Sequence, residues 1–423
     1  MPLVDPIYNV LNVSIMIGFG LLLFFARYKF KISFFAPALL YGLFWFFISL
    51  LAVLNYSIFP IHPLTLIYVI SSFLMLLVAH ILLNSKSNLS KLSINPQRSY
   101  NLYWNKLIVI MGFFFGIFAI ITIIIAHGFD FSDLFSPSKI ILLSNEAYAS
   151  KVRGDFSMPI LYSLLIPIFY ASSIFGGIYY ANDLKSKRIS FLPFLIGIII
   201  MLVETTKAPF LYTLILWIGG YFSFKVYEGR SDLLSKNFKS LITRFLLAII
   251  LLFIISKINR YNLLESTNNT GILSIILLKF QIYFFGGLSA FSEWICNVYD
   301  LNVSGIGFGR YTFGFFDKER GVFSDVMKFD NNYQTNIYTY FRHIITDFGI
   351  IGSLFFHLFI GILLSIIYRL VQSGKRLFIP ILTISYVFIM WSFIISIIIY
   401  KTILAATLIS ILLMFFSQLK LKK

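Results

Sequence analysis

The chain has 423 residues, of which 59% are hydrophobic and only 12% are charged. Soluble domains carry roughly 25% charged residues, so this composition excludes a water-soluble fold. The formal net charge is +17, but the basic residues punctuate apolar segments instead of gathering on one water-facing surface, so no nucleic-acid partner is expected. The single cysteine, Cys296, excludes an internal disulfide framework and a multi-cysteine metal site.

Apolar runs of about 20 residues, the length with which an α-helix crosses ~30 Å of hydrocarbon, predict the membrane spans. An apolar block at 191 to 224, interrupted around Lys207, predicts a hairpin of two short helices. We expect an all-α polytopic membrane protein with about 11 transmembrane helices, forming a single membrane domain over the whole chain. In chain order, the other predicted spans are 7 to 26, 33 to 54, 63 to 83, 107 to 126, 158 to 181, 241 to 258, 343 to 367, 377 to 398 and 400 to 417.

The connections between these spans differ in charge. One alternate set carries 21 basic and three acidic residues, whereas the rest of the chain carries 13 basic and 14 acidic residues. Cytoplasmic loops are enriched in Lys and Arg, so the N-terminus is expected on the outer side of the membrane and the C-terminus in the cytoplasm. Two long connections, 127 to 157 and 259 to 342, then form the first and second large outer loops.

The segment 271 to 295 of the second loop is itself apolar enough to span a membrane. If it crossed, every later span would invert and the basic C-terminal tail would face outward, against the charge rule. We therefore expect an interfacial or re-entrant helix, with Tyr283 and Trp294 at the level of the lipid headgroups.

Lys207 is the clearest charged residue at membrane depth, where a charge is costly and indicates a partner or a function. Two full spans need ~40 residues, more than the block 191 to 224 offers, so the turn with Lys207 is expected below the outer surface, in a cleft. Lys207 either binds a substrate phosphate or is neutralised by Glu204, three residues earlier on a helix.

Two further candidate residues are arginines of the long loops, Arg153 and Arg310. Arg153, just before the span that resumes at Met158, has a guanidinium suited to bidentate binding of a pyrophosphate. The alternative for Arg153 is an interfacial anchor at a helix end. Arg310, in the second loop, lies among alternating acidic and basic residues, a pattern typical of a solvated surface.

The densest polar cluster that enters a span is the run NIYTYFRHIITDFGIIG. In a helix, Thr339, Arg342 and Asp347 share one side, because residues three and four apart lie on one face, and His343 can take the place of Arg342 there. An Asp four residues after a His can orient its ring and raise its basicity, which predicts a general base. The structural alternative is that Asn336 or Thr339 caps the helix, Arg342 extends to the headgroups and His343 packs between helices.

The chain resembles the O-antigen polymerases of the Wzy type, the oligosaccharide repeat-unit polymerases. The resemblance rests on about eleven spans with two large outer loops, on a short hairpin with a basic tip, and on the polar run above. Where relatives commonly carry Arg at the hairpin tip, this chain has Lys207, which keeps the charge but not the bidentate fork. The family pattern Asn-x-Tyr-Thr, aromatic-Arg and Asp-Phe-Gly is matched by Asn336, Tyr338, Thr339, Phe341, Arg342, Asp347, Phe348 and Gly349.

The resemblance implies a glycosyltransferase of the GT-C type in the bacterial inner membrane that needs no metal and no cofactor. It would move a growing glycan from undecaprenyl pyrophosphate to the terminal sugar of another lipid-linked repeat unit at the periplasmic face. Arg153, Lys207 and Arg342 would stabilise the departing pyrophosphate. His343, oriented by Asp347, would accept the proton of the attacking sugar hydroxyl. Further site candidates are Asn336, Thr339 and Arg310.

The expected partners are the undecaprenyl-pyrophosphate-linked oligosaccharide, membrane lipid and a chain-length regulator protein. An O-antigen ligase, which transfers the finished glycan to a lipid core, shares this chemistry and is the first alternative. A lipid-linked oligosaccharide flippase or another transporter is the second alternative. A transporter is expected to have short loops and repeated halves, so the long loops at 127 to 157 and 259 to 342 count against it.

Overall fold

The computed structural model describes most of the helical part of the chain and pieces of the long loops. The predicted span 241 to 258 and Arg153 lie outside the described residues. The described residues are 6–84, 102–130, 132–133, 136, 138–139, 142–143, 145–147, 158–182, 188–204, 206–229, 278, 280–299, 307, 309–314, 323, 326–330 and 333–417.

Seven helices of the described residues are long and apolar enough to cross a membrane. They are α1 (Pro6–Lys29), α2 (Pro37–Leu54), α3 (Pro63–Asn84), α4 (Leu102–Ala126), α6 (Ile160–Ala181), α8 (Ala208–Tyr227) and α13 (Tyr340–Gln372). Shorter apolar helices are α7 (Leu192–Glu204), α14 (Ile379–Trp391) and α15 (Lys401–Phe416). The prediction of an α-helical multi-pass membrane protein is confirmed at this level, whereas the count of about eleven spans and the GT-C-like arrangement stay predictions.

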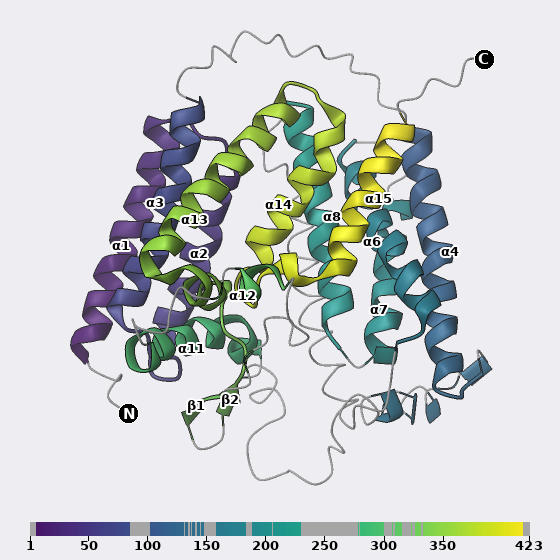
Figure 1. The fold of residues 1–423 in the computed structure, drawn as a ribbon, viewed down its shortest axis with the longest axis horizontal. Coiled ribbons are helices and arrows are strands. Elements are labelled where there is room, and N and C mark those ends of the chain that lie inside the picture. The colour runs from purple at the N-terminus through teal and green to yellow at the C-terminus, as the bar shows by residue number, and fades with distance from the viewer. Residues whose placement is uncertain are drawn as a thin grey trace. The chain divides into compact units, whose positions relative to one another are not determined.

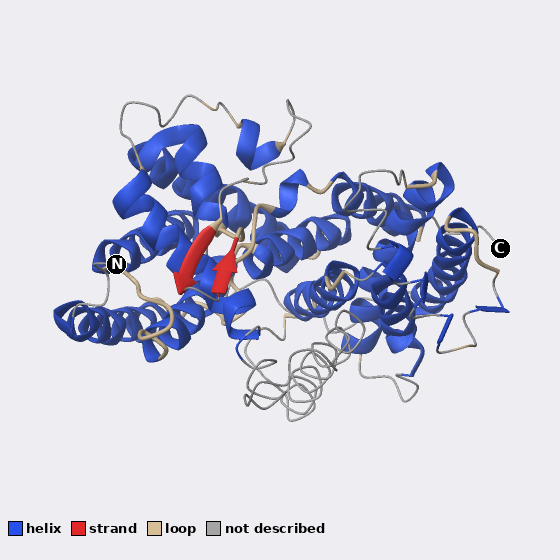
Figure 2. Cartoon of the chain, turned by 90° about the horizontal axis from the view of Figure 1, so that it is seen from below, coloured by secondary structure: helices blue, strands red, loops and turns tan. Residues whose placement is uncertain are grey.

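The remaining described elements are short and lie in the connections. The two strands pair antiparallel with Met327 opposite Thr335, and they appear in red in Figure 2. The elements are η3 (Arg188–Phe191), η4 (Ile282–Gly286), α11 (Gly287–Glu293), η5 (Trp294–Val298), α12 (Arg310–Phe313), β1 (Met327–Asp330), β2 (Tyr333–Thr335), η6 (Arg376–Phe378) and η7 (Ile397–Ile399).

The chain forms two compact units. Unit 1 comprises Met1–Ile94, Leu278–Gly374 and Ser385–Lys401, and so contains α1, α2, α3, α11, α12, both strands and α13. Unit 2 comprises Asn95–Leu277, Lys375–Ile384 and Thr402–Lys423, and contains α4, α6, α7, α8 and most of α15. Helix α14 contributes residues to each unit.

In unit 1 the helices α1, α2, α3 and α13 run side by side, and α11 lies across one end of them (Figure 1). Large apolar side chains of α1 such as Leu21 and Phe24 are exposed, as suits a helix that faces lipid tails. Helix α13 packs closely on α3 at Gly361, where a Cβ atom would stand 2.9 Å from the Ala79 Cβ.

In unit 2 the helix α8 is almost enclosed, because 94% of the residues in its most apolar 18-residue stretch are buried. Glycines let α6 and α8 approach each other. A Cβ atom at Gly177 would stand 1.9 Å from the Trp217 carbonyl oxygen, and one at Gly220 would stand 2.3 Å from the Ile174 carbonyl oxygen. Small residues at such contacts are typical of helix pairs in membranes.

The predicted hairpin over 191 to 224 is present as α7 and α8, which are separated at Lys207. Helix α7 has 13 residues and is about 20 Å long, too short to cross a bilayer. Helix α8 has 20 residues and is long enough to span it. The prediction of two short helices is therefore right for α7 and wrong for α8.

Helix α13 consists of two segments joined at Gly349, whose φ of 70° and ψ of 175° are not helical. The Tyr340 hydroxyl lies 2.5 Å from His357 Nε2, across a separation of 17 residues. In a straight helix these residues would stand about 25 Å apart. The short segment 340–348 therefore turns back on the long one, and the predicted continuous span from 343 to 367 is wrong at its start.

We expect Gly349→Ala to destabilise this break through backbone strain alone. The φ and ψ of Gly349 are accessible almost only to glycine, and such strain costs about 1–3 kcal/mol. No atom lies within 4 Å of the position where its Cβ would stand, so no clash contributes. Thermal unfolding of the purified protein measures the loss. Gly18→Ala is the control, because Gly18 is helical and has equally open surroundings. Equal melting temperatures for Gly349→Ala and wild type would contradict the break.

Candidate functional site

Arg342 is buried in an aromatic corner of unit 1. It is 7% exposed, so the alternative in which it extends to the headgroups is wrong. Its Cζ lies 3.7 Å from the ring centre of Phe323, 4.0 Å from that of Tyr338 and 5.1 Å from that of Trp294. The Phe323 and Tyr338 rings are 5.9 Å apart and inclined at 78°, so they form a corner and not a sandwich.

The aromatic corner fixes the direction of the Arg342 guanidinium. A cation over ring faces gains about 2 kcal/mol or more when desolvated, which offsets part of its cost of burial. The Phe323 and Tyr338 rings are nearly perpendicular, so a planar guanidinium that lies flat on one ring meets the other with its edge. The corner therefore restricts the orientation of Arg342.

His343 is packed against the same loop residue. It is 1% exposed, and its ring lies 5.0 Å from that of Phe323 at 57°. Phe323 therefore contacts both Arg342 and His343, which are adjacent in sequence. The two residues are thus buried side by side against one residue of the second loop, while the role of His343 as a proton acceptor stays a prediction.

Asp347 holds the short helix α12 in place. It is 1% exposed, and its carboxylate oxygens accept hydrogen bonds from the Tyr311 N–H at 3.2 Å and from the Thr312 N–H at 2.6 Å. The first N–H groups of a helix have no partner within it, so a carboxylate caps them well. Asp347 thus attaches part of the second loop to the site, a role that the sequence did not predict. The predicted orientation of the His343 ring by Asp347 stays a prediction.

Helix α11 covers this end of unit 1 by binding the α2–α3 connection. The Ser292 hydroxyl oxygen accepts hydrogen bonds from the His62 N–H at 2.8 Å and from the Thr65 hydroxyl at 3.0 Å, and the Ser289 hydroxyl donates to the Pro60 carbonyl at 2.7 Å. The π-helical turns η4 and η5 flank α11, and such turns are frequent at functional sites.

The described part of the predicted helix 271 to 295 is helical, and its interfacial position stays a prediction. Trp294, expected at headgroup level, is 8% exposed and packs on Arg342.

The connection between α14 and α15 closes the same end of unit 1. Helix α14 ends at Trp391 and not near residue 398 as predicted. The Ser392 carbonyl oxygen then accepts a hydrogen bond from the Tyr340 N–H at 3.0 Å, and Phe393 stacks on Phe284 with ring centres 5.1 Å apart. Irregular backbone in a membrane protein is tolerated where protein covers it, and Phe393 is 4% exposed.

Lys207 lies at the hairpin turn of unit 2. It is the half-buried residue that precedes α8. Nearby, the 8% exposed Glu204 accepts hydrogen bonds from the Tyr162 hydroxyl and, at 3.3 Å, from the Thr206 hydroxyl. The Glu204 carboxylate thus accepts from one hydroxyl on α6 and from one at the turn. Because Arg342 belongs to unit 1, binding of one pyrophosphate by Lys207 and Arg342 together stays a prediction, as does neutralisation of Lys207 by Glu204.

The further candidates differ in burial. Asn336 is exposed, as is Arg310 on α12. Thr339 is 0% exposed and is the N-cap residue of α13 by position, but its side chain makes no capping hydrogen bond, so the capping alternative is wrong for Thr339.

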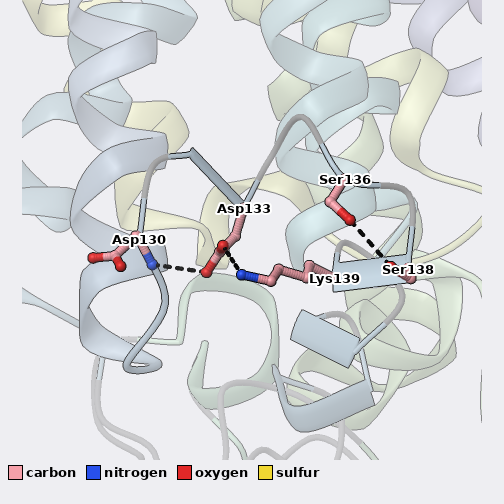
Figure 3. A network of polar contacts seen from close by, with 5 residues as sticks. All are labelled: Asp130, Asp133, Ser136, Ser138 and Lys139. Carbon is pink, nitrogen blue, oxygen red and sulfur yellow. Dashed lines mark hydrogen bonds and ion pairs between the residues drawn. The ribbon is translucent and has the colours of Figure 1, made fainter.

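The first loop contains a small polar network (Figure 3). The Asp133 carboxylate accepts hydrogen bonds from Lys139 Nζ at 2.5 Å and from the Asp130 N–H at 3.1 Å. The Ser136 and Ser138 hydroxyl groups lie 3.0 Å apart. The hydrogen bond from Lys139 lowers the pKa of Asp133, and the same bond raises the pKa of Lys139.

We expect this loop contact to open at both extremes of pH. Asp133 has a lowered pKa, so its contribution is present above its unfolded pKa and is lost as the pH falls through the folded value. Lys139 has a raised pKa, so its contribution is present below its unfolded pKa and is lost as the pH rises through the folded value. Hydrogen exchange of the loop amides across pH measures the opening. Asp133→Asn should abolish the opening at low pH. The same low-pH opening in that variant would show that Asp133 does not cause it.

Comparison of the chain with protein-family models, with curated proteins and with solved structures finds no match. Within the described part of the chain, no group of three or more His, Cys, Asp or Glu residues could hold a metal ion. The metal-independent reaction stays a prediction. Fold and site together define a multi-pass membrane protein with an adjacent, buried arginine and histidine at one end of a helical unit.

Proposed function

We propose that this protein is a glycan polymerase of the Wzy type in the bacterial inner membrane. It transfers a growing glycan from undecaprenyl pyrophosphate to the terminal sugar of another lipid-linked repeat unit at the periplasmic face. The observation that carries the proposal is the burial of Arg342 beside His343 beneath Phe323 of the second loop.

Arg342 suits the leaving group of this reaction. When the bond from the sugar C1 to the pyrophosphate breaks, negative charge develops on the phosphate oxygens. A guanidinium matches two such oxygens with two parallel N–H donors. Because the aromatic corner already fixes the direction of Arg342, little reorganisation is needed when the charge develops.

His343 suits the attacking group. A hydroxyl of the acceptor sugar forms the new bond to C1 and gives its proton to the imidazole, while the pyrophosphate leaves with the electron pair of the broken bond. A well-placed general base contributes about 10²- to 10⁴-fold to the rate of such a step. The atoms of the reaction therefore balance without a further reactant.

The distribution of charge in unit 1 supports a periplasmic site. Arg27 and Lys29 lie in the last turn of α1, and Arg369 lies in the last turn of α13, at the ends of those helices opposite to the site. The Arg369 guanidinium donates to the Leu83 carbonyl oxygen near the end of α3 at 2.7 Å. Cytoplasmic ends of spans are enriched in such residues, so the site end belongs to the periplasm in this proposal.

The glycan profile of cells that lack this protein tests the proposal. Loss of a polymerase leaves lipopolysaccharide capped with a single repeat unit, and complementation by the wild-type chain but not by His343→Gln should restore long chains. Uncapped core would identify a ligase, and repeat units retained on the inner face would identify a flippase. Long chains that persist without the protein would contradict polymerisation.

A further inference from the structure

A chain of hydrogen bonds inside unit 1 connects the site segment to the spans around it. The hydroxyl of Tyr340, the first residue of α13, lies 2.5 Å from His357 Nε2 and 2.6 Å from the Tyr41 hydroxyl of α2. The Tyr41 hydroxyl also lies 2.8 Å from the Ser72 hydroxyl of α3. Tyr340 and Tyr41 are 0% exposed and His357 is 2% exposed, so water does not replace a bond that is lost here.

The donor in the bond between Tyr340 and His357 follows from the other side of the imidazole ring. His357 Nδ1 lies 2.6 Å from the Ser353 carbonyl oxygen, which can only accept, so Nδ1 carries a proton. In the neutral imidazole Nε2 then accepts, and Tyr340 donates its single hydroxyl proton to it. At the far end, the Ser72 hydroxyl donates to the Val69 carbonyl oxygen at 2.7 Å. The position of the Tyr340 hydroxyl is therefore set by partners on two other helical segments.

We propose that His357 is a positioning residue that, through Tyr340, places the segment carrying Arg342 and His343. The inference rests on the proposed function for its catalytic consequence. Tyr340 is two residues from Arg342 in the same short segment, so a fixed Tyr340 fixes the start of the turn that bears the site.

The break at Gly349 explains why such a connection is needed. The short segment is joined to its own span through one residue with non-helical backbone, and the helical hydrogen-bond ladder does not continue across it. The bond from Tyr340 to His357 bridges this break from one side to the other. A second bond, from the Tyr340 N–H to the Ser392 carbonyl oxygen, fixes the backbone of the same residue.

Tyr68 provides a matched control in the same cluster. Its hydroxyl donates to the Ser353 hydroxyl at 2.7 Å, it is 6% exposed, and its ring lies 6.4 Å from that of His357. Tyr68→Phe removes one buried hydroxyl, as Tyr340→Phe does, but it leaves the connection between Tyr340 and His357 intact. A role in general stability would make the two variants alike.

Hydrogen exchange of the amides at 341–348 in the purified full-length protein tests positioning without reference to activity. We expect His357→Leu and Tyr340→Phe, which remove one and two buried hydrogen bonds of the Tyr340 hydroxyl, to raise these exchange rates roughly tenfold or more. His357→Gln, which keeps an acceptor, should recover most of the protection, and Tyr68→Phe should stay within about twofold of wild type. Unchanged exchange in Tyr340→Phe, or an equal rise in Tyr68→Phe, would overturn the proposal.

Polymerisation kinetics of the same variants test the catalytic consequence. Tyr340→Phe and His357→Leu should lower kcat about tenfold with little change in KM, because misplaced groups lose interactions made only in the transition state. The double variant should be no slower than the slower single one, because both changes remove one connection. A wild-type protein that does not polymerise would refute the proposed function, while the exchange rates would still decide the positioning role.

Discussion

Arg342→Ala is expected to reduce polymerisation by about 10²- to 10³-fold, the loss typical of removing one donor to a developing anion. Arg342→Lys keeps the charge but is expected to recover little of the rate. An ammonium group does not hold two phosphate oxygens in one plane, and it does not stack in the corner formed by Phe323 and Tyr338 as a guanidinium does. The length and rate of formation of the glycan ladder in complemented deletion cells measure both variants.

Arg369→Lys is the control for Arg342, because it makes the same substitution at the far end of α13. Arg369 donates to the Leu83 carbonyl oxygen at 2.7 Å, a contact that a lysine can also make, so ladders close to wild type are expected. Protein amounts in the membrane are compared by immunoblot. Full ladders from Arg342→Ala at wild-type protein level would remove Arg342 from the reaction.

Asp347→Asn is expected to release α12 from the site. The amide offers one acceptor oxygen where the carboxylate offers two, so either the Tyr311 N–H or the Thr312 N–H faces an NH₂ group. A hydrogen bond to a charged group contributes about 1.5–3 kcal/mol, and we expect a loss of that order in the stability of the loop contact. Limited proteolysis around α12 measures the opening, and polymerisation should fall with it.

Gly307→Ala should break the same contact from the other side. A Cβ atom at Gly307 would stand 2.2 Å from Asp347 Oδ1, so either the loop or the carboxylate must move. The effects of Gly307→Ala and Asp347→Asn should therefore be less than additive. Asp130→Asn, at an exposed position of the first loop, is the control and should leave α12 protected. Cleavage of Asp347→Asn at the wild-type rate would show that Asp347 does not hold α12.

The hydrophobic runs predicted the bounds of α1, α3, α4 and α6 to within a few residues. The predicted and observed bounds agree because a helix that crosses the lipid must be long and apolar along its whole length. The break at Gly349 was not predicted, since a glycine inside an apolar run does not reveal its φ angle. The early end of α14 at Trp391 escaped prediction because the following residues are as apolar as the helix.

The sequence indicated Arg342 and His343 because polar residues are rare at the start of a span. It did not indicate that Trp294 and Phe323 contact Arg342, because these contacts arise only when the second loop folds over the segment 340–348. Nothing in the sequence around His357 indicated a role for it, for a related reason. Its contact with Tyr340 exists only because the short segment turns back at Gly349.

The most direct test of the polymerase assignment uses the purified protein in liposomes with the undecaprenyl-pyrophosphate-linked repeat unit as its only sugar substrate. We predict a ladder of whole repeat units, one undecaprenyl pyrophosphate released for each bond formed, and no ladder with Arg342→Ala. A folded wild-type protein that leaves the single repeat units unchanged, or an equal ladder from Arg342→Ala, would contradict this account.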